Sequence, residues 1–169
     1  MIYRVLLLVG PMLACSNTLD TPQSTDEQLL PPYEAPYSAT VPTRLILREF
    51  NTALAQRRRM VVRSQAELKA IWAEVYARRA PMPAVPLVDF ERNTVLVAAM
   101  GQRNSGGHSI EFTQIATAGG NLAVTVTEVA PGAKCGVTGA LTSPIVILSV
   151  PKIDGHVQFI DFEEVRRCN

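Results

Sequence analysis

The sequence predicts a mostly β fold of the α+β class, an antiparallel β-sandwich or partly open barrel of about seven short strands with one packed α-helix. Two observations support this prediction. Short apolar or alternating segments rich in β-branched residues recur between Gly, Pro and Asn turn signals, as strands do. One further segment, residues 68–76, instead carries apolar residues at helical spacing.

Residues 43–51 read as the first strand, and residues 57–63 read as the second. Three arginines, Arg57 to Arg59, open the second strand. A basic triplet can bind phosphate or lipid headgroups, but no aromatic residues are interleaved with this one. We therefore expect a solvated turn or edge strand here.

A helix is predicted next, because Ser64 followed by Glu67 has the spacing of a capping box. Its apolar face carries Trp72, the only tryptophan, which we expect to anchor the helix on the sheet. The residues of that face are Leu68, Ile71, Trp72, Val75 and Tyr76. Pro81 and the prolines after it prevent the helix from continuing.

The centre of the chain holds an apolar run, residues 94–100, and an alternating segment, residues 109–115. The connection between them contains Gly106 and Gly107, which can take positive φ, and it predicts a hairpin-like pairing of the two strands. We expect a second loop, residues 129–136, to close the next strand pair in the same way. The remaining predicted strands are residues 121–129, which follow a tight turn at residues 119–120, and residues 141–151 and 155–162.

Composition limits the function classes. Hydrophobic residues make up 47% and charged residues 18% of the 169, which suits a globular domain with extra segments. A net charge of +1 gives no field for nucleic acid. Three cysteines and two histidines are too few and too scattered for a zinc signature, and no cofactor motif is present, so we expect neither a metal nor a cofactor.

The N-terminus predicts export. One positive charge precedes a short apolar stretch, too short to span a bilayer, that ends in Met12-Leu13-Ala14-Cys15 and resembles a bacterial lipobox. The resemblance implies a signal peptide over residues 1–14, lipid attachment (palmitate among the acyl chains) at Cys15, and a membrane anchor in the bacterial cell envelope. Ser16 is compatible with the outer membrane where a cell has two membranes. An ordinary signal peptide or a buried strand is the alternative.

Residues 15–42 are polar and then rich in proline, a composition that cannot bury enough apolar surface to offset the entropy of ordering. We expect a lipidated N-terminus and tether there, with the β domain occupying residues 43–169.

The loops of this domain resemble the PrcB C-terminal domain family when taken as an ordered set. The segments concerned are residues 101–110, 131–135, 140–144 and 150–152, and the resemblance extends by eye over residues 58–160. The family occurs in exported bacterial proteins, often lipoproteins. Its namesake is similar to an accessory subunit that binds and stabilises a secreted subtilisin-type protease. His108 stands where the family usually has an aromatic residue, and Gly139 where glutamine is frequent.

No catalytic constellation emerges, and we expect a protein that is not an enzyme. Ser105 lacks the glycine that a nucleophile elbow needs two positions earlier, where Arg103 stands. Cys135 with His108 or His156 could pair as nucleophile and base, but in an exported chain whose first cysteine is lipidated Cys135 and Cys168 form an even pair, which favours a structural disulfide. The carboxylates at positions 111, 128, 163 and 164 are expected on solvated faces.

A binding role is the more plausible prediction. The candidate partner-binding loop consists of Gln102, Arg103, Asn104, Ser105, Gly106, Gly107 and His108. The family resemblance implies a protein partner, a secreted protease or another envelope protein. The loop also has a short resemblance to the glycine-containing loop of chagasin-type protease inhibitors, so inhibition through Gly106 and Gly107 is one alternative. An envelope lipoprotein with a structural or ligand-binding role is the other.

Overall fold

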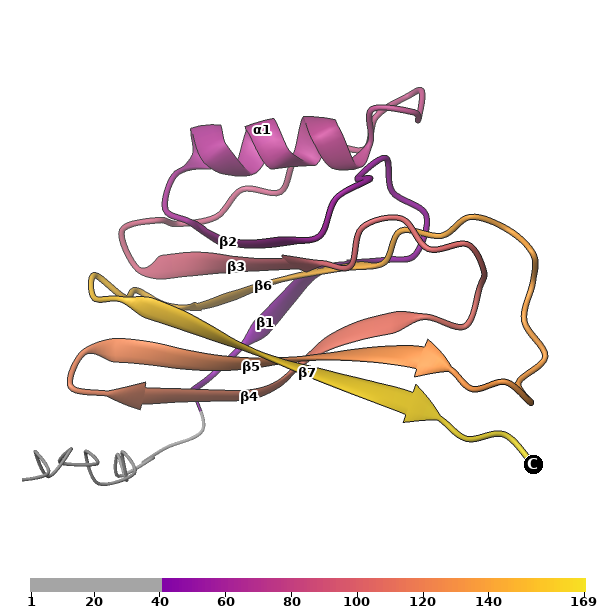
Figure 1. The fold of residues 1–169 in the computed structure, drawn as a ribbon. Helices are drawn as coiled ribbons and strands as arrows, with labels where there is room; N and C mark the ends of the chain where they lie inside the picture. Colours follow the sequence, from indigo (N-terminus) through magenta and orange to yellow (C-terminus); the bar gives the residue numbers. More distant parts are fainter. Residues whose placement is uncertain (1–40) are drawn as a thin grey trace, which may run out of the picture. The chain divides into compact units, whose positions relative to one another are not determined.

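The computed structural model describes residues 41–169, and the predicted signal peptide, Cys15 and all but the end of the predicted tether lie outside this range. The described part contains seven strands and one helix (Figure 1). In chain order these are β1 (Arg44–Glu49), β2 (Arg58–Val62), α1 (Gln65–Val75), β3 (Asn93–Ala99), β4 (Ser109–Ala118), β5 (Asn121–Pro131), β6 (Ile145–Pro151) and β7 (Val157–Arg166). The helix is too short and too polar to span a bilayer, and no other helix is found in the described part.

The strands form two sheets, so the predicted mostly β sandwich is confirmed, without closure into a barrel. One sheet has the order β1-β6-β3-β2 and the other the order β4-β5-β7. The helix covers the outer face of the four-stranded sheet, which gives three layers (Figure 1). One core lies between the two sheets and a second between the four-stranded sheet and the helix.

The central strands β3 and β6 are apolar on both faces because they belong to both cores. Leu96 and Ala98 face the other sheet, whereas Val95 and Val97 face the helix. All four side chains are fully buried. This double burial explains why residues 94–100 form an unbroken apolar run instead of alternating.

The helix begins and packs as its sequence predicts. The Ser64 side chain accepts a hydrogen bond from the Glu67 backbone N–H at 3.2 Å, and the Glu67 carboxylate in turn accepts from the Arg63 N–H at 2.8 Å. Trp72 is 5% exposed and donates its indole N–H to the Pro83 carbonyl at 3.0 Å. The indole therefore anchors the helix and also the chain that follows it, so the prediction for Trp72 is confirmed.

Two predicted connections are wrong. Residues 100–108 do not join a hairpin, because β3 and β4 belong to different sheets and the segment crosses from one to the other. Residues 132–144 likewise cross back, from β5 to β6. The only hairpin among the predicted loops is the turn between β4 and β5, where Gly119 and Gly120 both have positive φ, as a two-residue turn of this kind requires.

The sandwich is also not wholly antiparallel. β5 pairs with β4 antiparallel but with β7 parallel, from Leu122↔Val157 to Pro131↔Arg166. The parallel pair arises because β6, which lies between β5 and β7 in sequence, crosses to the other sheet. The chain therefore enters β7 at the end of the sandwich where β5 begins.

A buried carboxylate holds the two sheets together along one side. Glu128, on β5, is 4% exposed and lies in the three-stranded sheet. Its Oε1 accepts from the Arg57 guanidinium at 2.7 Å and from the Arg59 guanidinium at 2.5 Å, and both arginines come from the β2 side of the other sheet. Arg59 also reaches Asp161 on β7 at 2.8 Å. The ion cluster thus closes the sandwich between the edge strands β2 and β7.

This cluster corrects two expectations. The side chain of Arg59 is 12% exposed and pairs inward, so the basic triplet is not simply a solvated edge. Glu128 does not lie on a solvated face, whereas Glu111, Glu163 and Glu164 are exposed as expected. Arg59 and Glu128 each lie on the face of their strand that carries the core residues. Only the packing of one sheet on the other shows that their charges neutralise one another.

We predict that Glu128→Gln destabilises the fold by about 3 kcal/mol, because it leaves inward-facing guanidinium groups without their carboxylate. The side chain of Arg57 is 41% exposed, so water can solvate part of its charge in the variant, and this limits the loss of stability. Urea denaturation followed by circular dichroism measures the change. Glu164→Gln, at an exposed position on β7 with no ion pair among residues 41–169, is the matched control and should change stability by less than about 0.5 kcal/mol. Equal losses in the two variants would contradict this role of Glu128.

Candidate protein-binding surface

The long connections gather at one end of the sandwich, which we call the loop end. It consists of residues 50–57, 100–108 and 132–144, together with the C-terminal ends of α1 and β7, and lies on the right in Figure 1. They meet there because β1, β3, β5 and β7 all run toward this end. The predicted partner-binding loop is therefore one of several segments that form a common surface.

The predicted loop is held firmly by its neighbours. Arg103 and Thr142 exchange two backbone hydrogen bonds, of 2.7 and 3.0 Å, in an isolated antiparallel bridge. The Gly106 N–H donates to the Thr138 carbonyl at 2.9 Å, and the Thr142 hydroxyl donates to the Ser105 carbonyl at 2.8 Å. The loop is thus ordered by residues 138–142, a segment more than thirty positions later in the chain.

Only part of this loop faces solvent. Gln102, Asn104 and Gly107 are exposed, whereas Gly106 is buried and Arg103, Ser105 and His108 are half-buried. The Arg103 side chain turns inward and donates to the Oε2 atom of Glu128 at 3.1 Å. The Arg103 side chain is therefore part of the ion cluster. It stabilises the fold and is not available for contact with a partner.

The two adjacent glycines are required by packing. A Cβ atom on Gly106 would lie 2.5 Å from the Thr138 hydroxyl. Gly107 has a φ of +82°, and a Cβ atom there would lie 2.9 Å from a methyl carbon of Val137. Their absence of side chains lets the loop lie against residues 137–138, which accounts for both glycines without any insertion into a partner.

The surroundings of His108 favour its neutral form. Its Nδ1 atom is buried with no hydrogen-bond partner among residues 41–169, and its Nε2 atom lies 3.5 Å from the Ser105 hydroxyl. Burial lowers the pKa of His108, the nearby positive charge of Arg103 lowers it further, and Glu128 opposes these effects. The Ser105–His108 pair is long and no group orients Nδ1, so it does not have the geometry of an activated nucleophile.

Three exposed apolar side chains at the loop end were not predicted as site residues. Phe50 is 46% exposed, Val137 43% and Leu141 59%. The sequence pattern places Phe50 and Leu141 in strands, where an apolar residue is expected to be buried. Both instead lie just outside a strand, since β1 ends at Glu49 and β6 begins at Ile145.

Two open clefts lie beside these side chains. The larger, of about 590 Å³, lies between the C-terminal end of α1 and Leu141. The smaller, of about 310 Å³, lies between Phe50, His108 and Arg166. Both are lined by polar as well as apolar groups, a mixture suited to contact with another protein.

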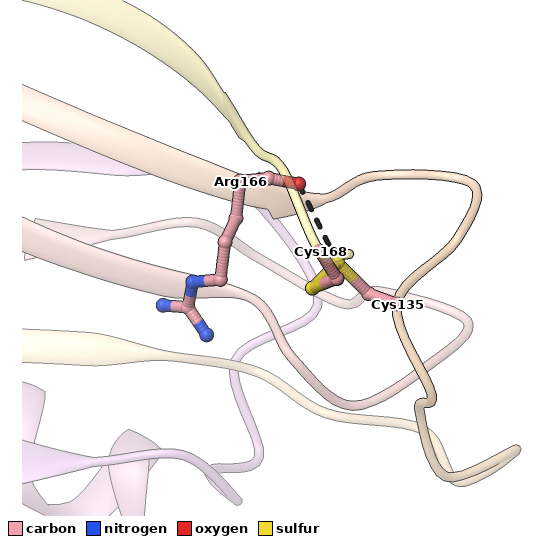
Figure 2. The surroundings of a disulfide bond; sticks show 3 residues. All are labelled: Cys135, Arg166 and Cys168. Atoms are coloured by element: carbon pink, nitrogen blue, oxygen red, sulfur yellow. Dashed lines mark hydrogen bonds between the residues drawn. A yellow bond between two sulfur atoms is a disulfide. The ribbon is translucent and has the colours of Figure 1, made fainter.

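A disulfide between Cys135 and Cys168 fixes the far side of the loop end (Figure 2). It joins the start of the connection between β5 and β6 to the chain just beyond β7. The Gly132 N–H donates to the Arg166 carbonyl at 2.9 Å, and Figure 2 shows the same carbonyl oxygen directed toward the Cys135 sulfur, 3.4 Å away. That second approach is a contact, since a disulfide sulfur carries no proton to donate.

The pairing places Cys135 in a structural bond rather than beside a histidine as a free thiol. Of the site residues predicted from the sequence, Cys135, Cys168 and the loop residues therefore lie at the same end of the domain, and Cys15 lies outside the described residues. Within residues 41–169 no group of three or more His, Cys, Asp or Glu side chains is placed to hold a metal ion.

The ordered loops and the strands between them are the part of the chain that carries a family signature. Residues 94–151 match the family model described as PrcB C-terminal. The matched segment extends from β3 through β6 and includes two of the three connections of the loop end, residues 100–108 and 132–144, so the resemblance to this family is confirmed there. No curated protein and no solved structure matches the chain.

We predict that the Cys135→Ser/Cys168→Ser variant loses about 2–4 kcal/mol of stability, because the closed loop no longer restricts the unfolded chain. The two cysteines are 33 positions apart. Hydrogen exchange should also become faster at the amide of Gly106, whose acceptor lies in the segment that the bond restrains. Ser16→Ala, which leaves the disulfide intact, serves as the control. Unchanged exchange at Gly106 would show that the loop is ordered without the disulfide.

We predict that His108 makes stability depend on pH. Since the folded pKa of His108 lies below its ordinary value of 6.5, the unfolded chain binds the proton more readily, and stability falls as the pH drops through and below about 6.5. The loss of melting temperature between about pH 7.5 and about pH 5.5 should be smaller in His108→Gln than in the wild type. His156→Gln, at an exposed histidine, should retain the wild-type difference. An unchanged difference in His108→Gln would assign the pH dependence to other groups.

Proposed function

We propose that this protein is an exported lipoprotein, anchored in the bacterial envelope through Cys15, whose β domain binds and stabilises a secreted subtilisin-type protease. The observation that carries the proposal is the PrcB C-terminal match over residues 94–151, the segment that supplies most of the loop end. The anchor rests on the lipobox-like Met12-Leu13-Ala14-Cys15, and the outer membrane is the destination compatible with Ser16. The protein itself acts as a binding subunit and not as a catalyst.

The surface chemistry supports a protein partner. Leu141 and Phe50 are large apolar side chains left about half exposed on a well-ordered framework. Buried apolar anchors of this kind provide much of the affinity in protein interfaces, and a framework that is already ordered lowers the entropy lost on binding. Exposed Gln102 and Asn104 supply polar groups at the rim.

The same geometry does not favour inhibition through Gly106 and Gly107. Both glycines pack against residues 137–138 of the same chain, so inserting them into a protease cleft would require that contact to be given up. A small apolar ligand is also not favoured, since the two clefts are open and partly polar.

Affinity capture with the full chain in mild detergent tests the proposal. The wild type should retain a protease from envelope extracts, and the half-life of that protease should fall in cells that lack this protein. Leu141→Asp should abolish the retention, because it places a charge in the apolar contact. Leu87→Asp is the matched control, since Leu87 is 89% exposed but lies on the connection that precedes β3, toward the opposite end of the sandwich.

Retention of the same proteins by the wild type and by Leu141→Asp would count against the loop end as the binding surface. A protease whose half-life does not change when this protein is removed would count against the stabilising role. Circular dichroism of each variant establishes that both substitutions leave the fold intact.

A further inference from the structure

The strand β7 is an open edge of the three-stranded sheet. The edge strands of the two sheets are β1, β2, β4 and β7. Natural proteins keep such edges from pairing with other chains by making them short or by placing a bulge in them. β2 has five residues, β1 has six with a register shift after Leu45, and β4 has a register shift after Phe112. β7 has ten residues in continuous register with β5, so within residues 41–169 it is the one edge that is neither short nor bulged.

Two hydrogen bonds show which backbone groups of β7 face away from β5. The His156 carbonyl accepts from the Leu122 N–H, and the Arg166 carbonyl accepts from the Gly132 N–H, both at 2.9 Å. The N–H and C=O of one strand residue point to the same side, and the side alternates from each residue to the next. Because the register is continuous, even-numbered residues of β7 bond to β5, and the odd-numbered residues of Val157–Val165 direct their backbone groups to the open edge.

The second half of β7 is exposed on both faces. Residues 161–166 are all exposed, and among them Phe162 is 58% and Val165 67% exposed. These two apolar side chains are three positions apart, so they lie on opposite faces of the strand. A segment paired along this edge would cover one apolar side chain on each face.

Two carboxylates lie between these apolar residues. Glu163 and Glu164 are consecutive, so each face also carries one acidic side chain. Within residues 41–169, neither carboxylate has a basic nitrogen within 4.0 Å, whereas Asp161 is paired with Arg57 and Arg59. Residues 162–165 therefore read apolar, acidic, acidic, apolar, with negative charge that the described domain does not neutralise.

We propose that the open edge of β7 binds an extended segment of another protein as an added strand, and that this segment carries two adjacent basic residues between two apolar residues. The odd-numbered backbone groups of β7 supply the hydrogen bonds of the new ladder. Glu163 and Glu164 lie opposite the basic side chains, and Phe162 and Val165 contact the apolar ones. The pattern is the same read in either direction, so it suits parallel and antiparallel pairing alike.

This inference goes beyond the proposed function. It assigns a contact surface separate from Phe50 and Leu141, and it does not require the partner to be a protease. A second copy of this chain suits the edge poorly. An antiparallel pair of β7 strands centred on Glu163 or on Glu164 would set that carboxylate directly opposite its own copy, and like charges in that position destabilise a sheet.

The test uses the full chain in neutral detergent and fluorescent peptides of equal length. One peptide has valine-lysine-lysine-phenylalanine at its centre, and the other has glutamate in place of both lysines. Fluorescence anisotropy should show saturable binding of the lysine peptide and none of the glutamate peptide. Binding should weaken as salt is raised, since exposed charges are screened.

Backbone methylation of the lysine peptide separates strand pairing from simple charge attraction. In either direction of pairing, the amides of the valine and of the second lysine face β7. N-methylation of these two amides should weaken binding by at least about tenfold, because it removes two ladder hydrogen bonds. N-methylation of the first lysine and the phenylalanine, whose amides face away, should leave most of the affinity. Equal binding of the two methylated peptides would overturn the proposal.

Glu163→Lys/Glu164→Lys should weaken binding of the lysine peptide by at least about tenfold. Glu91→Lys/Asp154→Lys makes the same change in net charge at exposed positions away from residues 161–166 and should leave the affinity unchanged. Circular dichroism of both variants establishes that they are folded. Equal effects of the two double variants, equal binding of the lysine and glutamate peptides, or no saturation at millimolar peptide would also count against the proposal.

The remaining outcomes concern other occupants of the edge. If the wild type elutes as a dimer in size-exclusion chromatography and the lysine peptide does not bind, the proposal is wrong and the edge belongs to a second copy. Failure here is separable from failure of the proposed function. If the lysine peptide does not bind but protease capture depends on Leu141, the accessory role stands without the β7 edge. If no protease is retained and the lysine peptide binds with the expected effect of methylation, the edge serves a different partner.

Discussion

The buried carboxylate of Glu128 is the constraint on which the rest of the structure depends. A charge in that position is tolerated only because the guanidinium groups of Arg57, Arg59 and Arg103 surround it. These groups come from the segment leading into β2, from β2 itself and from the connection after β3, whereas Glu128 comes from β5. One carboxylate therefore fixes how the two sheets and the loop end lie with respect to one another.

The candidate binding surface follows from this arrangement. Arg103 ties residues 102–108 to the ion cluster, and residues 138–142 hold the same loop by backbone hydrogen bonds. The disulfide of Cys135 with Cys168 then joins the latter connection to the chain after β7. Phe50 and Leu141 are presented on segments whose positions are already determined, and such a surface loses little conformational entropy when it meets a partner.

Arginines therefore have two separate uses in this domain. Those near the sandwich interior form hydrogen-bonded ion pairs that stabilise the fold, while Arg78 and Arg166 are exposed and make no ion pair within residues 41–169.

The sequence by itself determined the local features: the strands, the capped helix anchored by Trp72, the turn at Gly119 and Gly120, and the resemblance of residues 94–151 to the PrcB C-terminal family. Periodicity, capping and turn chemistry depend on neighbouring residues, so they can be read along the chain. Only the tertiary structure decided that β3 and β4 lie in different sheets, that β5 and β7 are parallel, and that Glu128 is buried. These depend on which strands meet across the sandwich, and the same alternating pattern is compatible with either face being solvated until a second sheet covers one of them.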